Sequence, residues 1–181
     1  MDGERPLHRG PVPAGDKLRF ERLETPFRVV LVEPEIPPNT GAVGRTCVGT
    51  GSPLHLVGKL GFDISDHAVR RAGLDYWPLL ELHRHAAWDD FEAAHPDCRP
   101  TLFTGNASRS YLEADLIPGD ALVFGKESVG LSSAILERHP TRVFGIPTAG
   151  GVRSLNLSNA VGIVLFEALR QSGALARTFT G

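Results

Sequence analysis

The sequence has few cysteines, no long apolar run and no large excess of charge. Only two of its 181 residues are cysteines, Cys47 and Cys98, which excludes a disulfide framework. It contains no run of about 18 or more apolar residues, so a transmembrane helix is excluded. The N-terminus also lacks the apolar core of a secretory signal. We therefore expect a cytoplasmic protein of about one domain.

The charge balance limits the kind of partner. A formal net charge of −2 argues against a protein that coats nucleic acid without specificity, although it allows a local basic patch. Residues 1–26 are rich in proline, glycine and charge, and we expect them to form a flexible leader. The folded domain is then expected to span residues 27–181.

Several signatures of catalysis are absent. Gly125 and Gly130 have the spacing of a phosphate-binding loop, but Leu131 and Ser132 follow where that motif requires Lys and Ser or Thr. The segment GTGSPL lacks the third glycine of the dinucleotide-binding fingerprint. There is no G-x-S-x-G elbow. The seven histidines include only a lone H-x-H pair, at 83 and 85. We expect no metal and no acyl enzyme.

Apolar segments alternate with helical ones from Phe27 onward, which predicts an α/β fold with a mainly parallel sheet flanked by helices. The expected strands are almost continuously apolar and lie within 27–34, 53–58, 100–106, 120–127 and 142–147. The expected helices lie within 39–51, 63–74, 86–95, 132–139 and the C-terminal segment after 156. In that last helix, Ile163 and Phe166 widen the apolar face, so we expect it to be largely buried.

Three expected strands are followed by loops of small and polar residues. These loops are TGNAS, GKESVG and PTAGGVRS. Because loops at the carboxyl ends of parallel strands line the ligand crevice, three such loops on one edge favour a binding site over simple turns.

Polar residues also crowd the start of two helices. Asn39 or Thr40 can cap the helix that follows two prolines, and Arg45 lies further along it. By spacing alone, Arg45 either extends to solvent or binds a phosphate or an oxyanion. The segment RSLNLSN at 153–159 has more hydroxyls and amides than one helix cap needs, and the surplus can serve a ligand.

The segment RRAGLDYW at 70–77 places two arginines near Tyr76 and Trp77. This composition suits phosphate contact and base stacking, and it also suits a solvated helix end with a packed tryptophan.

Three segments together resemble a known family. EPEIPPNTGAVGRTC, LVFGKESVGLS and IPTAGGVRSLNLSNAVGIVLFEAL occur in the order of the three motifs of SPOUT-class RNA 2′-O-ribose methyltransferases. EPEIPPNTG and RRAGLDY are similar to the TrmL branch, which methylates the ribose 2′-oxygen of cytidine or uridine at wobble position 34 of tRNA. The resemblance implies a C-terminal deep trefoil knot, a homodimer, S-adenosylmethionine as cofactor without a metal, and the tRNA anticodon stem-loop as partner.

The resemblance also assigns roles to residues. It implies a catalytic group of Arg45, Asn39, Glu127, Ser154 and Asn156. It implies a cofactor site of Thr104, Gly105, Gly125, Glu127, Gly130, Ile146, Ser154 and Leu155. We expect RNA contacts from Arg70, Arg71 and Arg153. Since a guanidinium hardly deprotonates in proteins, we interpret Arg45 as an electrostatic clamp on the phosphate and the nascent oxyanion.

Two alternatives stay open. The loop GKESVGLS is more similar to TrmH-type relatives, so the target can be another ribose in tRNA or in ribosomal RNA. A noncatalytic knotted RNA-binding module is the other alternative, although such a module has no need for Arg45, Glu127, Ser154 and Asn156 together.

Overall fold

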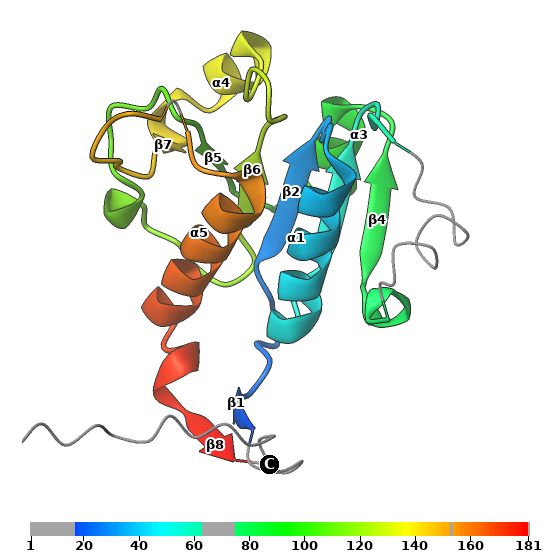
Figure 1. Ribbon diagram of the computed structural model, residues 1–181, viewed down its shortest axis with the longest axis vertical. Coiled ribbons are helices and arrows are strands. Elements are labelled where there is room, and N and C mark those ends of the chain that lie inside the picture. The colour runs from blue at the N-terminus through cyan, green and yellow to red at the C-terminus, as the bar shows by residue number, and fades with distance from the viewer. Residues whose placement is uncertain (1–16, 63–74, 153, 181) are drawn as a thin grey trace, which may run out of the picture.

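A six-stranded parallel sheet forms the centre of the molecule (Figure 1). The computed structural model describes residues 17–62, 75–152 and 154–180. In spatial order, the strands are β4 (Leu82–His85), β3 (Leu54–Val57), β2 (Arg28–Val32), β6 (Ala121–Phe124), β5 (Pro100–Phe103) and β7 (Val143–Phe144). All neighbouring pairs are parallel. The prediction of an α/β fold with a mainly parallel sheet is confirmed.

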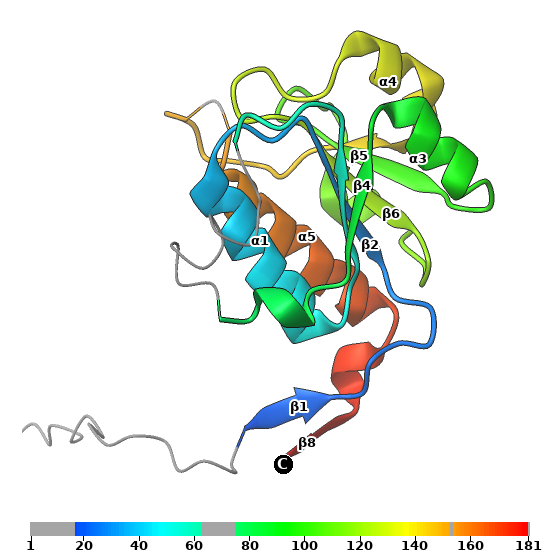
Figure 2. The same ribbon diagram turned by 90° about the vertical axis from the view of Figure 1, so that its right-hand side faces the viewer.

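Helices cover both faces of this sheet (Figure 2). Helices α1 (Pro37–Thr50) and α5 (Leu157–Gln171) pack on one face, and α3 (Trp88–Ala94) and α4 (Ser133–Arg138) pack on the other. The described chain also contains short 3₁₀ turns. These are η1 (Trp77–Leu79), η2 (Tyr111–Glu113), η3 (Pro140–Arg142) and η4 (Ala174–Ala176). Because both faces are covered, strands β3, β5 and β6 are buried along their whole length, which explains why their sequences are mostly apolar.

Helix α1 begins earlier than the sequence predicts. Its N-cap position is Ile36, which makes no side-chain capping bond, and Pro37 occupies the first turn. Proline suits that position because its backbone angle is already helical and its missing N–H has no helical partner to lose. Asn39 and Thr40 are therefore buried inside the helix, and the expectation that one of them caps it is wrong.

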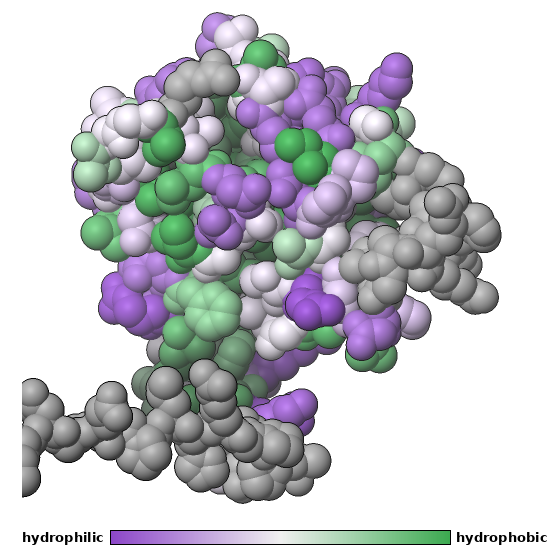
Figure 3. All heavy atoms as spheres, in the orientation of Figure 1, coloured by the Kyte–Doolittle hydropathy of each residue, from purple (hydrophilic) through white to green (hydrophobic). Residues whose placement is uncertain are grey.

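Helix α5 is capped as its sequence suggests, but it is less buried. The side-chain oxygen of Asn156 accepts hydrogen bonds from the backbone N–H groups of Ser158 and Asn159. Ile163 and Phe166 remain 37% and 47% exposed, so the expectation of a largely buried helix is wrong for its outer side. Figure 3 shows hydrophobic residues gathered over this side of α5.

The two ends of the described chain pair with each other. Strand β1 (Leu18–Phe20) is antiparallel to β8 (Thr178–Thr180), at the far end of α5 from the loops that follow β5 and β6 (Figure 1). Phe20 packs against the main core, so ordered structure precedes the boundary expected near Phe27. The leader as a whole and the domain boundary stay predictions, because residues 1–16 lie outside the described chain.

Some expectations fall outside what the fold establishes. The helix expected within 63–74 lies outside the described residues, and the trefoil knot stays a prediction. Strand β4 was not predicted, because its sequence LHRH is polar and lies at a sheet edge. Across the described ranges, no helix is both long enough and apolar enough to span a bilayer.

Candidate functional site

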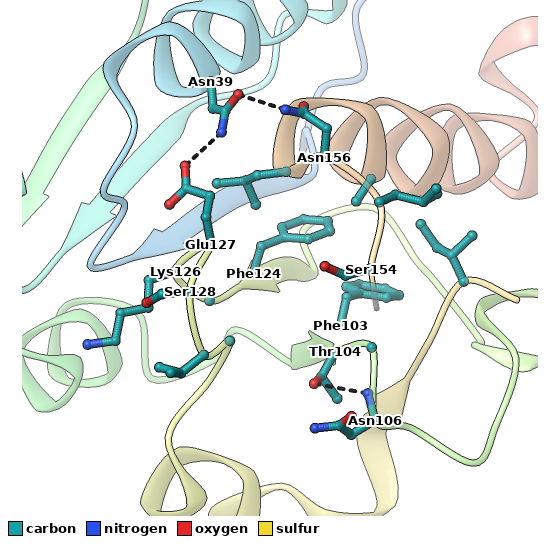
Figure 4. Close-up of a pocket in the computed structure, with 18 of the residues that line it drawn as sticks. Asn39, Phe103, Thr104, Asn106, Phe124, Lys126, Glu127, Ser128, Ser154 and Asn156 are labelled. Carbon is teal, nitrogen blue, oxygen red and sulfur yellow. Dashed lines mark hydrogen bonds between the residues drawn. The ribbon is translucent and has the colours of Figure 1, made fainter. Parts of the chain in front are cut away.

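The loops that follow β5, β6 and β7 line one cavity of about 620 Å³ (Figure 4). These three strands are neighbours in the sheet and run in the same direction, so their carboxyl ends meet at one edge. The N-terminal ends of α1 and α5 contribute the remaining wall. The expectation that the three loops share one edge is confirmed, and the cavity has the size of a small-molecule site.

The cavity lining includes every residue that we assigned to the cofactor. These residues are Thr104, Gly105, Gly125, Glu127, Gly130, Ile146, Ser154 and Leu155. Sequence reasoning missed Phe103 and Phe124, whose rings stack with centroids 5.2 Å apart at the ends of β5 and β6. Their position as the last strand residue before a glycine-bearing loop is the signal that could have found them.

Two glycines allow the loops to pack tightly. A Cβ atom on Gly125 would lie 2.1 Å from the carbonyl carbon of Gly130, which is far closer than van der Waals contact. A Cβ atom on Gly145 would lie 2.8 Å from the backbone oxygen of Thr104. The close approach of the backbone therefore requires glycine at both positions.

A chain of hydrogen bonds joins the cavity loops to both helices. The side-chain amide of Asn39 donates to Glu127 Oε1 at 2.9 Å, and its oxygen accepts from Asn156 Nδ2 at 2.9 Å (Figure 4). Glu127 also accepts two backbone hydrogen bonds. The N–H of Glu35 donates to Oε2 at 2.9 Å, and the N–H of Ile36 donates to Oε1 at 3.3 Å. The structure therefore brings together Asn39, Glu127 and Asn156, and Ser154 lines the same cavity, whereas the catalytic roles of these residues stay predictions.

Further polar contacts hold the loop after β6 against the segment after β2. The backbone N–H and the hydroxyl of Ser128 donate to the two carboxylate oxygens of Glu35 at 3.0 and 2.9 Å. These hydrogen bonds hold the pKa of Glu35 below its usual value. Lys126 Nζ pairs with Glu33 Oε2 at 2.8 Å, which raises the pKa of Lys126. The loop thus has anchors on both sides of Glu127.

Arg45 is not among the cavity-lining residues. Its side chain is 69% exposed, its guanidinium carbon lies 4.8 Å from the ring centre of Tyr76, and one of its nitrogens lies 3.7 Å from Asp75 Oδ1. The Tyr76 hydroxyl donates to the backbone oxygen of Gly41 at 2.5 Å, and burial raises the pKa of Tyr76. Arg45 is therefore held on the outer side of α1, and its catalytic role stays a prediction.

The expected RNA-contacting residues cannot be placed in the same way. Arg70, Arg71 and Arg153 lie outside the described residues. Trp77 is half-buried, and two of its ring carbons lie 3.2 and 3.6 Å from where a Cβ on Gly44 would be, so this ring packs against α1.

Comparisons with known proteins agree with this geometry. The model of the SpoU rRNA Methylase family matches residues 26–166. The chain belongs to this family. A Burkholderia ambifaria protein named tRNA (cytidine(34)-2′-O)-methyltransferase is 49% identical over 150 residues, which are 81% of this chain and 96% of that protein.

Two solved structures are similar to this chain in fold. One is described as giving insights into the 2-OH methylation of C/U34 on tRNA; it has 44% identity and a TM-score of 0.75, and the match covers 80% of this chain and 95% of that chain. The other is an AdoMet-bound rRNA methyltransferase from Sinorhizobium meliloti, with 28% identity and a TM-score of 0.70. The match covers 84% of this chain and 61% of that chain. For this SpoU-family chain, these likenesses confirm the family resemblance and the fold class.

The Asn39–Glu127 contact predicts an unusual pH dependence for one variant. In N39D, a second carboxyl group would face Glu127 at hydrogen-bond distance, and two such groups must share a proton. The folded-state pKa of the pair then rises above the unfolded value near 4. The free energy of unfolding of N39D should therefore be greatest in mild acid. As the pH rises, it should fall by up to about 1.4 kcal/mol per pH unit until the pH passes the folded-state pKa.

Chemical denaturation at several pH values between about pH 5 and about pH 8 measures this effect. Asn39→Ala is the control, because it removes the hydrogen bonds to Glu127 and Asn156 without adding a carboxyl group. Equal pH dependence in the two variants would contradict the assigned contact.

Proposed function

We propose that this chain transfers a methyl group from S-adenosylmethionine to the ribose 2′-oxygen at wobble position 34 of tRNA, in cytidine or uridine. The observation that carries the proposal is the cavity formed by three glycine-bearing loops at one sheet edge. The names of relatives that align over 81% of this chain support the choice of tRNA and of position 34. We place this activity in the cytoplasm, which suits a chain whose two cysteines are unpaired.

The cavity fits the proposed cofactor in size and character. Its lining combines aromatic and aliphatic side chains with the backbone of Gly105, Gly125 and Gly130, which suits a flat base beside polar groups. A relative with 28% identity is described as AdoMet-bound. When bound, S-adenosylmethionine supplies an electrophilic methyl group on a positively charged sulfur.

The hydrogen-bonded residues position the cavity loops. Both carboxylate oxygens of Glu127 already accept hydrogen bonds from within the chain, so Glu127 is poorly placed to act as a general base. We assign Glu127, Asn39 and Asn156 as positioning residues that hold the loops in a geometry ready for in-line transfer. Ser154 is assigned to the cavity wall, in hydrogen-bonding support of the cofactor.

Arg45 is assigned to the substrate. Its side chain is 69% exposed beside Tyr76 and Asp75, so an RNA phosphate can reach the guanidinium, which we also expect to stabilise charge on the attacking ribose oxygen. Because a guanidinium keeps its proton, the hydroxyl proton has to leave through the phosphate or a water molecule. Arg70, Arg71 and Arg153 are assigned to the RNA backbone.

We also propose that the chain works as a homodimer through the outer side of α5. Ile163 and Phe166 expose apolar surface there, and such a face is typically covered by another protein surface. A second copy of this chain is the occupant that the family resemblance implies, and two-fold dimers are the commonest assemblies of soluble proteins.

A second target remains a candidate because of one observation. The matching family is described as one of rRNA methylases, and the AdoMet-bound relative is an rRNA methyltransferase. The same cavity and the same Arg45 would serve a ribose in ribosomal RNA or elsewhere in tRNA. A noncatalytic RNA-binding module is the remaining alternative, and cofactor binding distinguishes it.

Methyl transfer to tRNA tests the target directly. Purified protein, labelled S-adenosylmethionine and tRNA from cells that lack this protein should give a 2′-O-methyl group on nucleotide 34, located by nucleoside mass spectrometry of the fragmented tRNA. Label on another tRNA or ribosomal ribose would keep the enzyme class and reject position 34. No transfer, with an active control enzyme alongside, would reject the proposal.

Substitution of Arg45 tests the need for a guanidinium. Arg45→Lys keeps the positive charge but loses the fork of donors, so turnover should fall by roughly 10²-fold or more, the usual cost of removing a donor that stabilises the transition state. Arg22→Lys is the matched control, because Arg22 is exposed and paired with Glu81 at 3.0 Å, and neither residue lines the cavity. Near-normal turnover in Arg45→Lys would exclude a specific guanidinium requirement.

Gly125→Ala tests whether the cavity binds the cofactor. The added Cβ collides with the backbone of Gly130, so the loop has to shift and affinity for S-adenosylhomocysteine should fall at least about tenfold, by more than 1.4 kcal/mol. Gly49→Ala, where a Cβ would meet nothing within 4 Å, should bind normally and be slightly more stable as a helix. Calorimetric titration measures both variants. An absence of binding in the unmodified chain would favour the noncatalytic module.

A further inference from the structure

A cluster of histidines lies between the sheet and helix α3, on the face opposite α1 and α5. His55 of β3, His85 at the end of β4 and His95 at the end of α3 each offer a ring nitrogen, and these nitrogens lie within 4.8 Å of one another. Spacing along the chain predicts no metal site, but the parallel register places His55 beside β4 and α3 brings His95 back over it. Three histidines that are distant in sequence therefore converge.

The buried member of the cluster, His55, has one ring nitrogen that lacks a hydrogen-bond partner among the described residues. His55 is only 1% exposed, and among the described residues its Nε2 atom has no hydrogen-bond partner. Its Nδ1 atom lies 3.0 Å from His85 Nε2, so a single proton can be shared between those two rings. A buried nitrogen without a donor or acceptor is costly unless another ligand satisfies it.

We propose that His55, His85 and His95 form a binding site for a divalent transition-metal ion of the zinc type. Imidazole nitrogens suit this class of ion, and three protein ligands leave a fourth position for water. His85 and His95 are half-buried rather than enclosed, so an ion can enter from solvent. The nearby charges are a positive one at Arg28 and a negative one at Asp90, so we expect moderate rather than very tight affinity.

The proposed site has a structural effect. A metal bound there would link an inner strand, the edge strand and the end of α3, and so hold α3 against the sheet. Of these three elements, none contributes a residue to the lining of the cofactor cavity. Metal binding should therefore change the stability of the chain. If the chain binds no metal, the proposed methyl transfer is not affected.

Titration of the full chain, without an affinity tag, tests the site with Zn²⁺ alone. We expect one ion per chain by calorimetry and a higher midpoint of thermal unfolding in its presence. His95→Gln and His85→Gln should each lower the Zn²⁺ affinity at least about tenfold. Loss of a residue that only hydrogen-bonds to a metal ligand typically costs that much, and loss of the ligand itself should cost at least as much. His83→Gln is the matched control within the cluster, because His83 stacks on His55 but is not one of the three proposed ligands.

His139→Gln is a second control, since His139 also contacts α3, through Glu92, but lies outside the cluster. Thermal unfolding without metal shows whether each variant folds, and the use of two ligand variants keeps the test valid if one does not. Absence of binding would overturn the proposal. So would a loss of affinity in His83→Gln with none in His95→Gln, because binding would then belong to the surface H-x-H pair.

Discussion

The carboxylate of Glu127 joins parts of the chain that are far apart in sequence. Its two oxygens accept from the backbone N–H groups of Glu35 and Ile36 and from the side chain of Asn39. Glu35 and Ile36 are exposed, so water can replace the carboxylate at their N–H groups, but the buried amide of Asn39 would lose its partner at a cost of about 1–3 kcal/mol. The loop after β6 and the N-terminal end of α1 are therefore tied together by one side chain, and the cavity wall depends on that tie.

Asn156 extends the same constraint to the C-terminal helix. Its oxygen caps α5, and its nitrogen donates to Asn39, so one side chain both starts a helix and completes a wall of the cavity. Because the two functions share one residue, the position of α5 and the shape of the cavity cannot vary independently. Loops held by such contacts are arranged before a ligand arrives, which spares the cost of ordering them on binding.

The parts that local sequence could predict are those governed by local rules. Continuous apolar segments identified β2, β3, β5, β6 and β7, and the glycine-bearing loops after the last three identified the cavity edge. Strand β4 was missed because an edge strand has no need to be apolar. The hydrogen-bond partners of Asn39 could not be predicted either, because they depend on which loop crosses the start of α1. From the sequence alone, a helix-capping role explained Asn39 equally well. The histidine cluster escaped for the same reason, since sheet register and not spacing unites it.

Helix geometry explains why Asn39 and Arg45 separate. The two residues are six apart on α1, so at 3.6 residues per turn their side chains leave the helix about 120° apart. Asn39 points to Glu127 and Asn156, whereas Arg45 lies against Tyr76 on the exposed side. In the proposed reaction, the cofactor is then held on one side of α1 and an RNA phosphate on another. The RNA has to extend from the Tyr76 side to the mouth of the cavity, so cofactor affinity and RNA affinity depend on separate sets of contacts.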